Sequence, residues 1–153
     1  MRSLLVAVLL SSAFILPPGA ALAAGEPIGF VRNLSGTASL TRGGDTIPAA
    51  EGMKLLVGDT LVTGPDGSLG AIFRDDSSIS MGPDSSFAVR NFEFAPEAGK
   101  YGLLIRITRG SLAYLSGLIG KLSPESARFE TPTATIGIRG TRFAVQVGEP
   151  VTQ

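Results

Sequence analysis

The chain lacks three residue types that carry much of protein chemistry: it has no cysteine, no histidine and no tryptophan. Without cysteine there is no disulfide framework, no thiolate nucleophile and no cysteine-based zinc or iron–sulfur site. Without histidine the chain alone builds no Ser-His-Asp triad, no imidazole acid or base and no histidine-containing metal site. The sequence therefore predicts a protein with no catalytic residues, no metal site and no cofactor.

The chain also lacks an excess of charge of either sign. Its 13 Lys and Arg residues balance its 13 Asp and Glu residues, so no basic surplus is present to neutralise a run of phosphates. Nucleic acid is therefore excluded as an expected partner. A length of 153 residues provides for one domain, and the 20 glycines and 10 prolines suit short strands joined by tight turns.

The N-terminal residues have the three parts of a secretory signal peptide. Arg2 supplies a positive charge, residues 4–16 form an apolar run, and Ala21-Leu22-Ala23 offers a small-x-small cleavage site. An uncleaved membrane anchor is the alternative, but the run is shorter than the roughly 20 apolar residues that span a bilayer. We expect residues 1–24 to be removed and residues 25–153 to form a β domain that is periplasmic or secreted, with no stable membrane insertion after cleavage.

Most of the remaining chain alternates apolar and polar residues with a period of two. This period is typical of strands that bury one face and expose the other. The alternating apolar sets are Ala38 and Leu40; Ile79 and Met81; Leu103, Ile105 and Ile107; Ala134, Ile136 and Ile138; and Phe143, Val145 and Val147. Turn sequences rich in Gly, Pro and Asp separate these runs. The predicted fold class is all-β, with short strands and tight turns in a solenoid-like or double-sheet stack.

Three further features refine this expectation. Phe87 and Val89 stand at odd positions of the chain, whereas Phe92 and Phe94 stand at even positions. Because this change of parity would move the apolar residues to the other face of the strand, we predict a β-bulge near Arg90-Asn91. In addition, Gly64-Pro65-Asp66-Gly67-Ser68 recurs 18 residues later as Gly82-Pro83-Asp84-Ser85-Ser86. Such an echo indicates either stacked β-coils or the hairpins of a two-sheet sandwich. The segment 116–127 interrupts the strand pattern and is expected to be a partly apolar loop.

Five acidic residues, Asp59, Asp66, Asp75, Asp76 and Asp84, raise the question of a calcium site. The Asp-x-Asp-x-Asp-Gly signature of calcium loops is absent, so we interpret these residues as turn residues that bond to nearby backbone amides. A Ser–Lys nucleophile pair is the remaining catalytic option without histidine, but no lysine stands in a Ser-x-x-Lys setting.

Four residues are candidates for binding a protein partner. Arg139 and Arg142 flank Gly140-Thr141, and an arginine beside a glycine turn can bind a carboxylate or phosphate. The alternative is that the glycine supplies an unusual backbone conformation while the arginines pair with surface acids. Phe92 and Phe94, on the strand with the register slip, are an exposed aromatic pair in one interpretation and core residues in the other.

Taken together, several blocks of the chain resemble the FecR domain. They are Gly29-Phe30-Val31, Gly58-Asp59-Thr60-Leu61-Val62-Thr63-Gly64, Ile72 to Ile79, Arg109-Gly110-Ser111-Leu112, and Ile138-Arg139-Gly140-Thr141-Arg142-Phe143-Ala144-Val145. The resemblance implies an all-β extracytoplasmic domain. In the family's regulator of iron-dicitrate uptake, this domain follows a cytoplasmic anti-sigma segment and a transmembrane helix, and it relays the state of an outer-membrane receptor.

This chain is expected to lack the cytoplasmic segment, the retained membrane helix and the receptor-contacting domain of such regulators. We therefore expect a non-catalytic binding module that contacts another envelope protein through strand edges or turn tips, accessory to iron uptake or cell-surface signalling. The alternative is a self-associating structural or adhesive surface protein. A hydrolase acting on envelope polysaccharide is the third hypothesis and has the least support.

Overall fold

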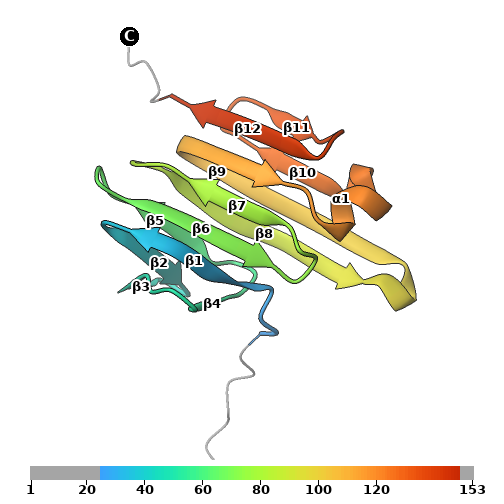
Figure 1. Cartoon of the computed structure of the whole chain (residues 1–153), viewed down its shortest axis with the longest axis horizontal. Helices are drawn as coiled ribbons and strands as arrows, with labels where there is room; N and C mark the ends of the chain where they lie inside the picture. Colours follow the sequence, from blue (N-terminus) through green and yellow to red (C-terminus); the bar gives the residue numbers. More distant parts are fainter. Residues whose placement is uncertain (1–24, 149–153) are drawn as a thin grey trace, which may run out of the picture.

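The alternating segments form two β-sheets that share one long strand, which confirms the all-β prediction (Figure 1). The structure, a computed structural model, describes residues 25–148. Its elements are β1 (Gly29–Ser35), β2 (Ala38–Arg42), β3 (Asp45–Pro48), β4 (Lys54–Leu55), β5 (Thr60–Thr63), β6 (Ser68–Phe73), β7 (Ser78–Met81), β8 (Ser86–Ala95), the 3₁₀ turn η1 (Pro96–Ala98), β9 (Lys100–Leu115), α1 (Leu118–Leu122), the 3₁₀ turn η2 (Pro124–Ser126), β10 (Ala127–Glu130), β11 (Thr135–Gly137) and β12 (Arg142–Val147).

The strands follow one path that curls into a half-barrel, so its two halves face each other. We call one half sheet A, with the order β4-β1-β6-β7-β9-β12, and the other sheet B, with the order β3-β2-β5-β8-β9-β10-β11. Neighbours are antiparallel except for β10 and β9, which are parallel. Strand β9 belongs to both sheets, because residues up to Arg109 pair with β8 and residues from Gly110 onward pair with β12.

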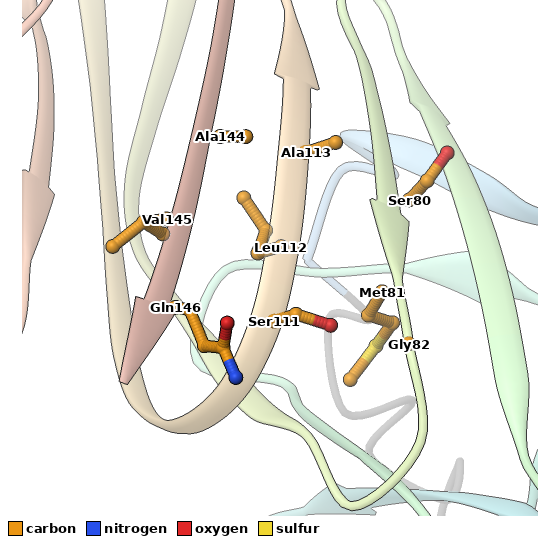
Figure 2. A pocket seen from close by; sticks show the side chains of 9 residues that line it. All are labelled: Ser80, Met81, Gly82, Ser111, Leu112, Ala113, Ala144, Val145 and Gln146. Atoms are coloured by element: carbon orange, nitrogen blue, oxygen red, sulfur yellow. The ribbon is translucent and has the colours of Figure 1, made fainter. Parts of the chain in front are cut away.

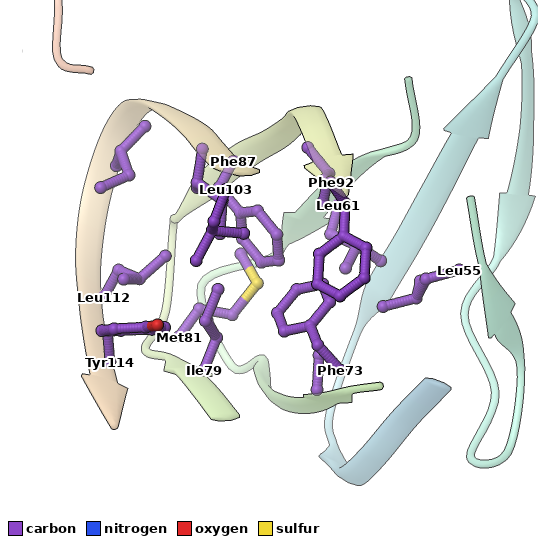
Figure 3. Close-up of a cluster of buried hydrophobic side chains, with 14 of the residues drawn as sticks. Leu55, Leu61, Phe73, Ile79, Met81, Phe87, Phe92, Leu103, Leu112 and Tyr114 are labelled. Carbon is purple, nitrogen blue, oxygen red and sulfur yellow. The ribbon is translucent and has the colours of Figure 1, made fainter. Parts of the chain in front are cut away.

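The core lies between the two sheets and is built from the apolar faces that the alternation predicted. Leu103, Ile105 and Ile107 are each at most 1% exposed. Phe73 of sheet A stacks on Phe92 of sheet B with ring centroids 5.8 Å apart, and Figure 3 shows these rings among the surrounding aliphatic side chains. Dispersion contacts and the removal of apolar surface from water therefore hold the two sheets together.

The 18-residue echo marks two similar arches that pass from one sheet to the other. Residues 64–67 connect β5 of sheet B to β6 of sheet A, and residues 82–85 connect β7 of sheet A to β8 of sheet B. Because β5 pairs with β8 and β6 pairs with β7, the two arches lie side by side. The echo thus reflects a stack of arches within a double sheet.

Hydrogen bonds join these arches to two further crossings, one at Thr37 and one at Ser111, and we call this side of the molecule the arch end. Gly64 donates its amide to the carbonyl of Thr37 at 2.8 Å, and Asp84 donates to the carbonyl of Gly64 at 3.1 Å. Gly82 donates to the carbonyl of Ser111 at 3.2 Å. The arch end therefore connects all four crossings in a continuous series of backbone bonds.

The predicted β-bulge in β8 is confirmed. Val89 lies opposite Ile105 and Asn91 lies opposite Leu104, so Arg90 is the extra residue. The bulge restores the apolar face of the strand after the change of parity, because Val89 and Phe92 are both buried.

The segment after β9 differs from the loop that the sequence predicted. Five residues form the short helix α1, which begins after Gly117. Ile119 is fully buried, whereas Leu118 and Leu122 are 37% and 57% exposed. The amide of Leu118 bonds to the carbonyl of Asp75 at 2.7 Å. Contacts with a distant turn therefore stabilise this helix. Its own sequence, which contains a glycine, has too low a helix propensity for the helix to be predicted.

Within residues 25–148, the structure has no helix long and apolar enough to cross a membrane. The predicted signal peptide, residues 1–24, lies outside the described residues.

Candidate functional site

Both candidate arginines lie on the surface near the start of β12. Arg139 is in the connection from β11 to β12, Arg142 is the first residue of β12, and both are exposed. Between them Gly140 has a φ of 132°, a conformation that side chains other than glycine rarely adopt. Within residues 25–148 the ion pairs involve neither arginine. Arg139 also lines a groove of about 710 Å³ with Glu125 and Ile138.

The two candidate phenylalanines are not an exposed pair. Phe92 is 8% exposed and stacks on Phe73, so the interpretation of Phe92 as a surface residue is wrong and core packing holds. The bulge explains this position, because it turns Phe92 to the inner face of sheet B. Phe94 is half-buried beside Tyr101, with ring centroids 6.3 Å apart. Of the two phenylalanines, Phe94 is therefore the one that is partly exposed.

Asp59, one of the acids considered for calcium, holds two strands together. It is 1% exposed, and Arg42 of β2 donates two hydrogen bonds to its carboxylate at 2.8 and 2.7 Å. The amide of Leu56 donates a third bond at 2.8 Å. The hydrogen bonds to Asp59 raise the pKa of Arg42. This fork-to-carboxylate geometry accounts for the burial of the acid.

Asp75 has a similar structural role in the turn between β6 and β7. Its carboxylate is fully buried and accepts bonds from the amides of Ser77 and Ile119 at 3.1 and 3.2 Å. These bonds tie the turn to α1 and agree with the interpretation of Asp75 as a turn residue. Within residues 25–148 no group of His, Cys, Asp or Glu side chains is arranged to hold a metal ion.

The hydroxyl of Tyr114 lies in the same buried region as Asp75. Tyr114 is 1% exposed, its hydroxyl faces Ser77, Ser116 and Gly117, and it makes no hydrogen bond of good geometry. Burial, and secondarily the charge of Asp75, raise the pKa of this tyrosine. The buried hydroxyl is therefore held in its neutral form.

Ser123, two residues after Lys121, makes hydrogen bonds within the loop that follows α1. The hydroxyl of Ser123 bonds to the carboxylate of Glu125 and lies 2.8 Å from the hydroxyl of Ser126. The bond from Ser123 lowers the pKa of Glu125. The hydrogen bonds of the Ser123 hydroxyl are thus with Glu125 and Ser126, and none of them joins it to a lysine within residues 25–148.

The outer face of sheet A brings together residues that are far apart in the sequence. Strand register places its outward side chains in two adjacent rows across five strands. The apolar row contains Phe30, Ile72, Ser78, Leu115 and Arg142. The small row contains Arg32, Gly70, Ser80, Ala113 and Ala144. Neither row contains an acid. The apolar row has Arg142 at the β12 side, and the small row has Arg32 at the β1 side.

Three residues of the small row, Ser80, Ala113 and Ala144, have short side chains and line a shallow groove together with Gly82, Ser111 and Gln146. Figure 2 shows Ala144, Ala113 and Ser80 at one level of this groove. Its volume is about 520 Å³. In the apolar row alongside, Phe30 and Leu115 are 39% and 41% exposed. The face therefore offers a hollow beside an apolar ridge, which is a common composition for a protein-binding surface.

Sequence reasoning did not find this face. The outward residues Gly70, Ser80, Ala113 and Ala144 each look like ordinary small residues in the solvent-facing positions of separate strands. Ser80, Ala113 and Ala144 line a groove only because three strands place them at the same level. The one signal available in the sequence was the lack of long polar side chains at these outward positions.

Comparison with known proteins gives one match. The sequence profile of the family described as FecR protein matches residues 59–153. The matched region begins at Asp59, so it includes the candidate arginines and leaves out β1 to β4. No curated protein and no solved structure matches the chain.

Proposed function

Because the chain belongs to the FecR family, we propose that it is a non-catalytic, exported module that binds another protein of the bacterial cell envelope. The family is associated with regulators of iron-uptake signalling. The partner that we propose is therefore a component of such a cell-surface signalling system. The signal-peptide pattern of residues 1–24 supports the periplasm or the cell exterior as the location.

The outer face of sheet A carries this proposal. It combines the exposed Phe30 and Leu115 with a groove that a partner's side chains can fill. Arg142 closes the apolar row at the β12 side, where it is placed to pair with a carboxylate of the partner. Arg139 in the preceding connection extends the set of candidate contacts, and the half-buried Phe94 on β8 of sheet B is a separate candidate.

The alternative function, a self-associating structural or adhesive protein, requires an assembly that continues from copy to copy. Open-ended strand pairing needs two receptive edges. At the far end of the sheets, β3 carries Pro48 and β4 has only two residues. Such edges resist the addition of a strand, so the geometry favours the binding module.

Photo-crosslinking in the native host tests the proposal. A photoreactive amino acid at Ala113, within the groove, should form adducts with another envelope protein that mass spectrometry can identify. The matched control is the same amino acid at Ala88, an outward residue of β8 in sheet B, which should not form that adduct.

The identity of the adduct decides between the functions. A receptor of an iron-uptake system or a membrane-bound sigma regulator would support the signalling role. Adducts only with further copies of the chain, or equal adducts from both positions, would contradict the proposal and favour the structural alternative.

A further inference from the structure

Strand β12 is an unpaired edge of sheet A. It pairs with β9 on one side and with no other strand of residues 25–148, and Figure 1 shows it at the end of the molecule opposite β3 and β4. The amide of Ser116 donates to the carbonyl of Thr141 at 2.8 Å, which fixes the hydrogen-bonding parity of the pair. By this parity Arg142, Ala144 and Gln146 direct their backbone N–H and C=O groups away from β9, toward the open edge.

This edge carries few of the features that protect exposed strands. Proteins blunt such edges with proline, lysine, bulges or very short strands. The edge strands β3 and β4 contain Pro48 and Lys54, and β11 has three residues. In contrast β12 has six residues, no proline, no lysine and a single charge at Arg142, its first position.

We propose that the protein forms a two-fold dimer in which β12 pairs antiparallel with β12 of a second copy. With Ala144 opposite Ala144 of that copy, the three outward-directed residues exchange backbone hydrogen bonds across the axis. Arg142 then lies opposite Gln146 of the second copy, so no two like charges face each other. The sequence of β12 is therefore complementary to itself in this register.

The inner side of β12 is also suited to a second copy. Phe143, Val145 and Val147 point inward but are only half-buried, and the ring of Phe143 lies 5.2 Å from that of Phe129 at the end of the core. In the proposed register Phe143 lies opposite Val145 of the second copy. Aromatic and β-branched pairs of this kind stabilise neighbouring strands.

The dimer is closed, because each copy uses β12 and the other edge strands compared above, β3, β4 and β11, are short or protected. It joins the outer faces of the two A sheets into one continuous surface. The inference goes beyond the proposed function: the partner contacts side chains on the outer face, Ala144 included, whereas the second copy bonds to the backbone edge of β12.

The absence of native cysteine gives a direct test of the register. In the purified exported protein, Ala144→Cys places two thiols opposite each other in a hydrogen-bonded antiparallel pair, where the Cα atoms are about 5.5 Å apart. This spacing fits a disulfide. We expect rapid oxidation to a linked dimer on a non-reducing gel. Ala113→Cys, one strand further in on the same face, is the matched control and should remain monomeric.

Sedimentation of the protein at concentrations up to about 1 mM tests the edge itself. The unmodified protein should approach twice the monomer mass, and Ala144→Pro, which removes an outward amide that β9 does not use, should sediment as a folded monomer. If that variant misfolds, Ala144→Lys replaces it, with Ala113→Lys as control. A monomer at every concentration, or equal disulfide yields from both cysteine variants, would overturn the dimer while leaving the crosslinking test of the function unaffected.

Discussion

At the scale of single residues, Gly110 determines how β9 passes from one sheet to the other. It has a φ of 83°, and an added Cβ would overlap the Cα and side chain of Ser85. Ser85 in turn accepts a hydrogen bond from the amide of Ser111 at 2.9 Å. The close approach of the two chains therefore requires a residue without a side chain.

We expect Gly110→Ala to lower the free energy of unfolding by about 3 kcal/mol, because left-handed strain and steric overlap both contribute. Gly43→Ala is the control, since Gly43 also has a positive φ, 58°, but has no atoms near the position of an added Cβ. That variant should lose only about 1 kcal/mol. Urea unfolding measures both values, and equal losses would show that the overlap with Ser85 is unimportant.

Tyr114 should make the protein sensitive to alkali. Its pKa is raised in the folded state by burial and by the charge of Asp75. The unfolded state therefore releases the phenolic proton first, and stability falls as the pH rises from the ordinary pKa of about 10 through the raised value.

We expect Tyr114→Phe to reduce this alkaline loss. At neutral pH the variant should be about as stable as the unmodified protein, because its buried hydroxyl lacks a well-formed hydrogen bond. Thermal unfolding between pH 7 and the alkaline range, recorded for both proteins, measures the difference. Parallel pH profiles would exclude Tyr114 as the source.

At the scale of elements, the bulge in β8 sets which aromatic residues enter the core. Deleting Arg90 would shift the following residues by one position, and a one-residue shift moves side chains to the opposite face of a strand. Phe92 would leave its stack with Phe73, at a cost of about 3 kcal/mol or more.

Arg90→Ala is the control for the deletion, because it keeps the extra residue and changes only an exposed side chain. It should alter stability by no more than about 0.5 kcal/mol. Near-UV circular dichroism and urea unfolding distinguish the two variants. A deletion variant with native spectra and stability would show that the bulge does not set the register.

The strands and the bulge could be predicted because each depends on neighbouring residues. Val89 and Phe92 reveal their change of parity within four positions of the chain. The helix α1 could not be predicted, because its position depends on Asp75, 44 residues before Ile119. The interpretation of Phe92 as an exposed residue was wrong for a related reason: its place in the alternation was visible, but the sheet that it packs against was not.

At the scale of the whole molecule, the folded unit extends beyond the region that matches the family. The match begins at Asp59, but β1 and β2 are paired inside sheets A and B. Val31, Leu40 and Leu55, which precede the match, are completely buried. The resemblance from Gly29 onward is consistent with this packing, and the candidate face itself includes Phe30 of β1.

A fragment of residues 59–153 should therefore fail to fold by itself. Removing β1 to β4 exposes the edges of β5 and β6 and removes part of the core. We expect aggregation or a disordered far-UV circular dichroism spectrum, whereas residues 25–153 give a β spectrum and a single peak in size-exclusion chromatography. A soluble fragment with cooperative unfolding would contradict this prediction.

The path of the strands also has a mechanical consequence. Strand β1 begins at Gly29 on the side opposite the arch end, and β12 finishes at Val147, opposite Gly110 at the arch end. A force applied between these two points runs parallel to the strands. It therefore acts on all the hydrogen bonds of a strand pair together instead of breaking them one after another. The strands that join β1 to β12 are β6, β7 and the second part of β9, so the load passes through sheet A. A protein with this layout can transmit tension between two attachment points without first losing an end strand.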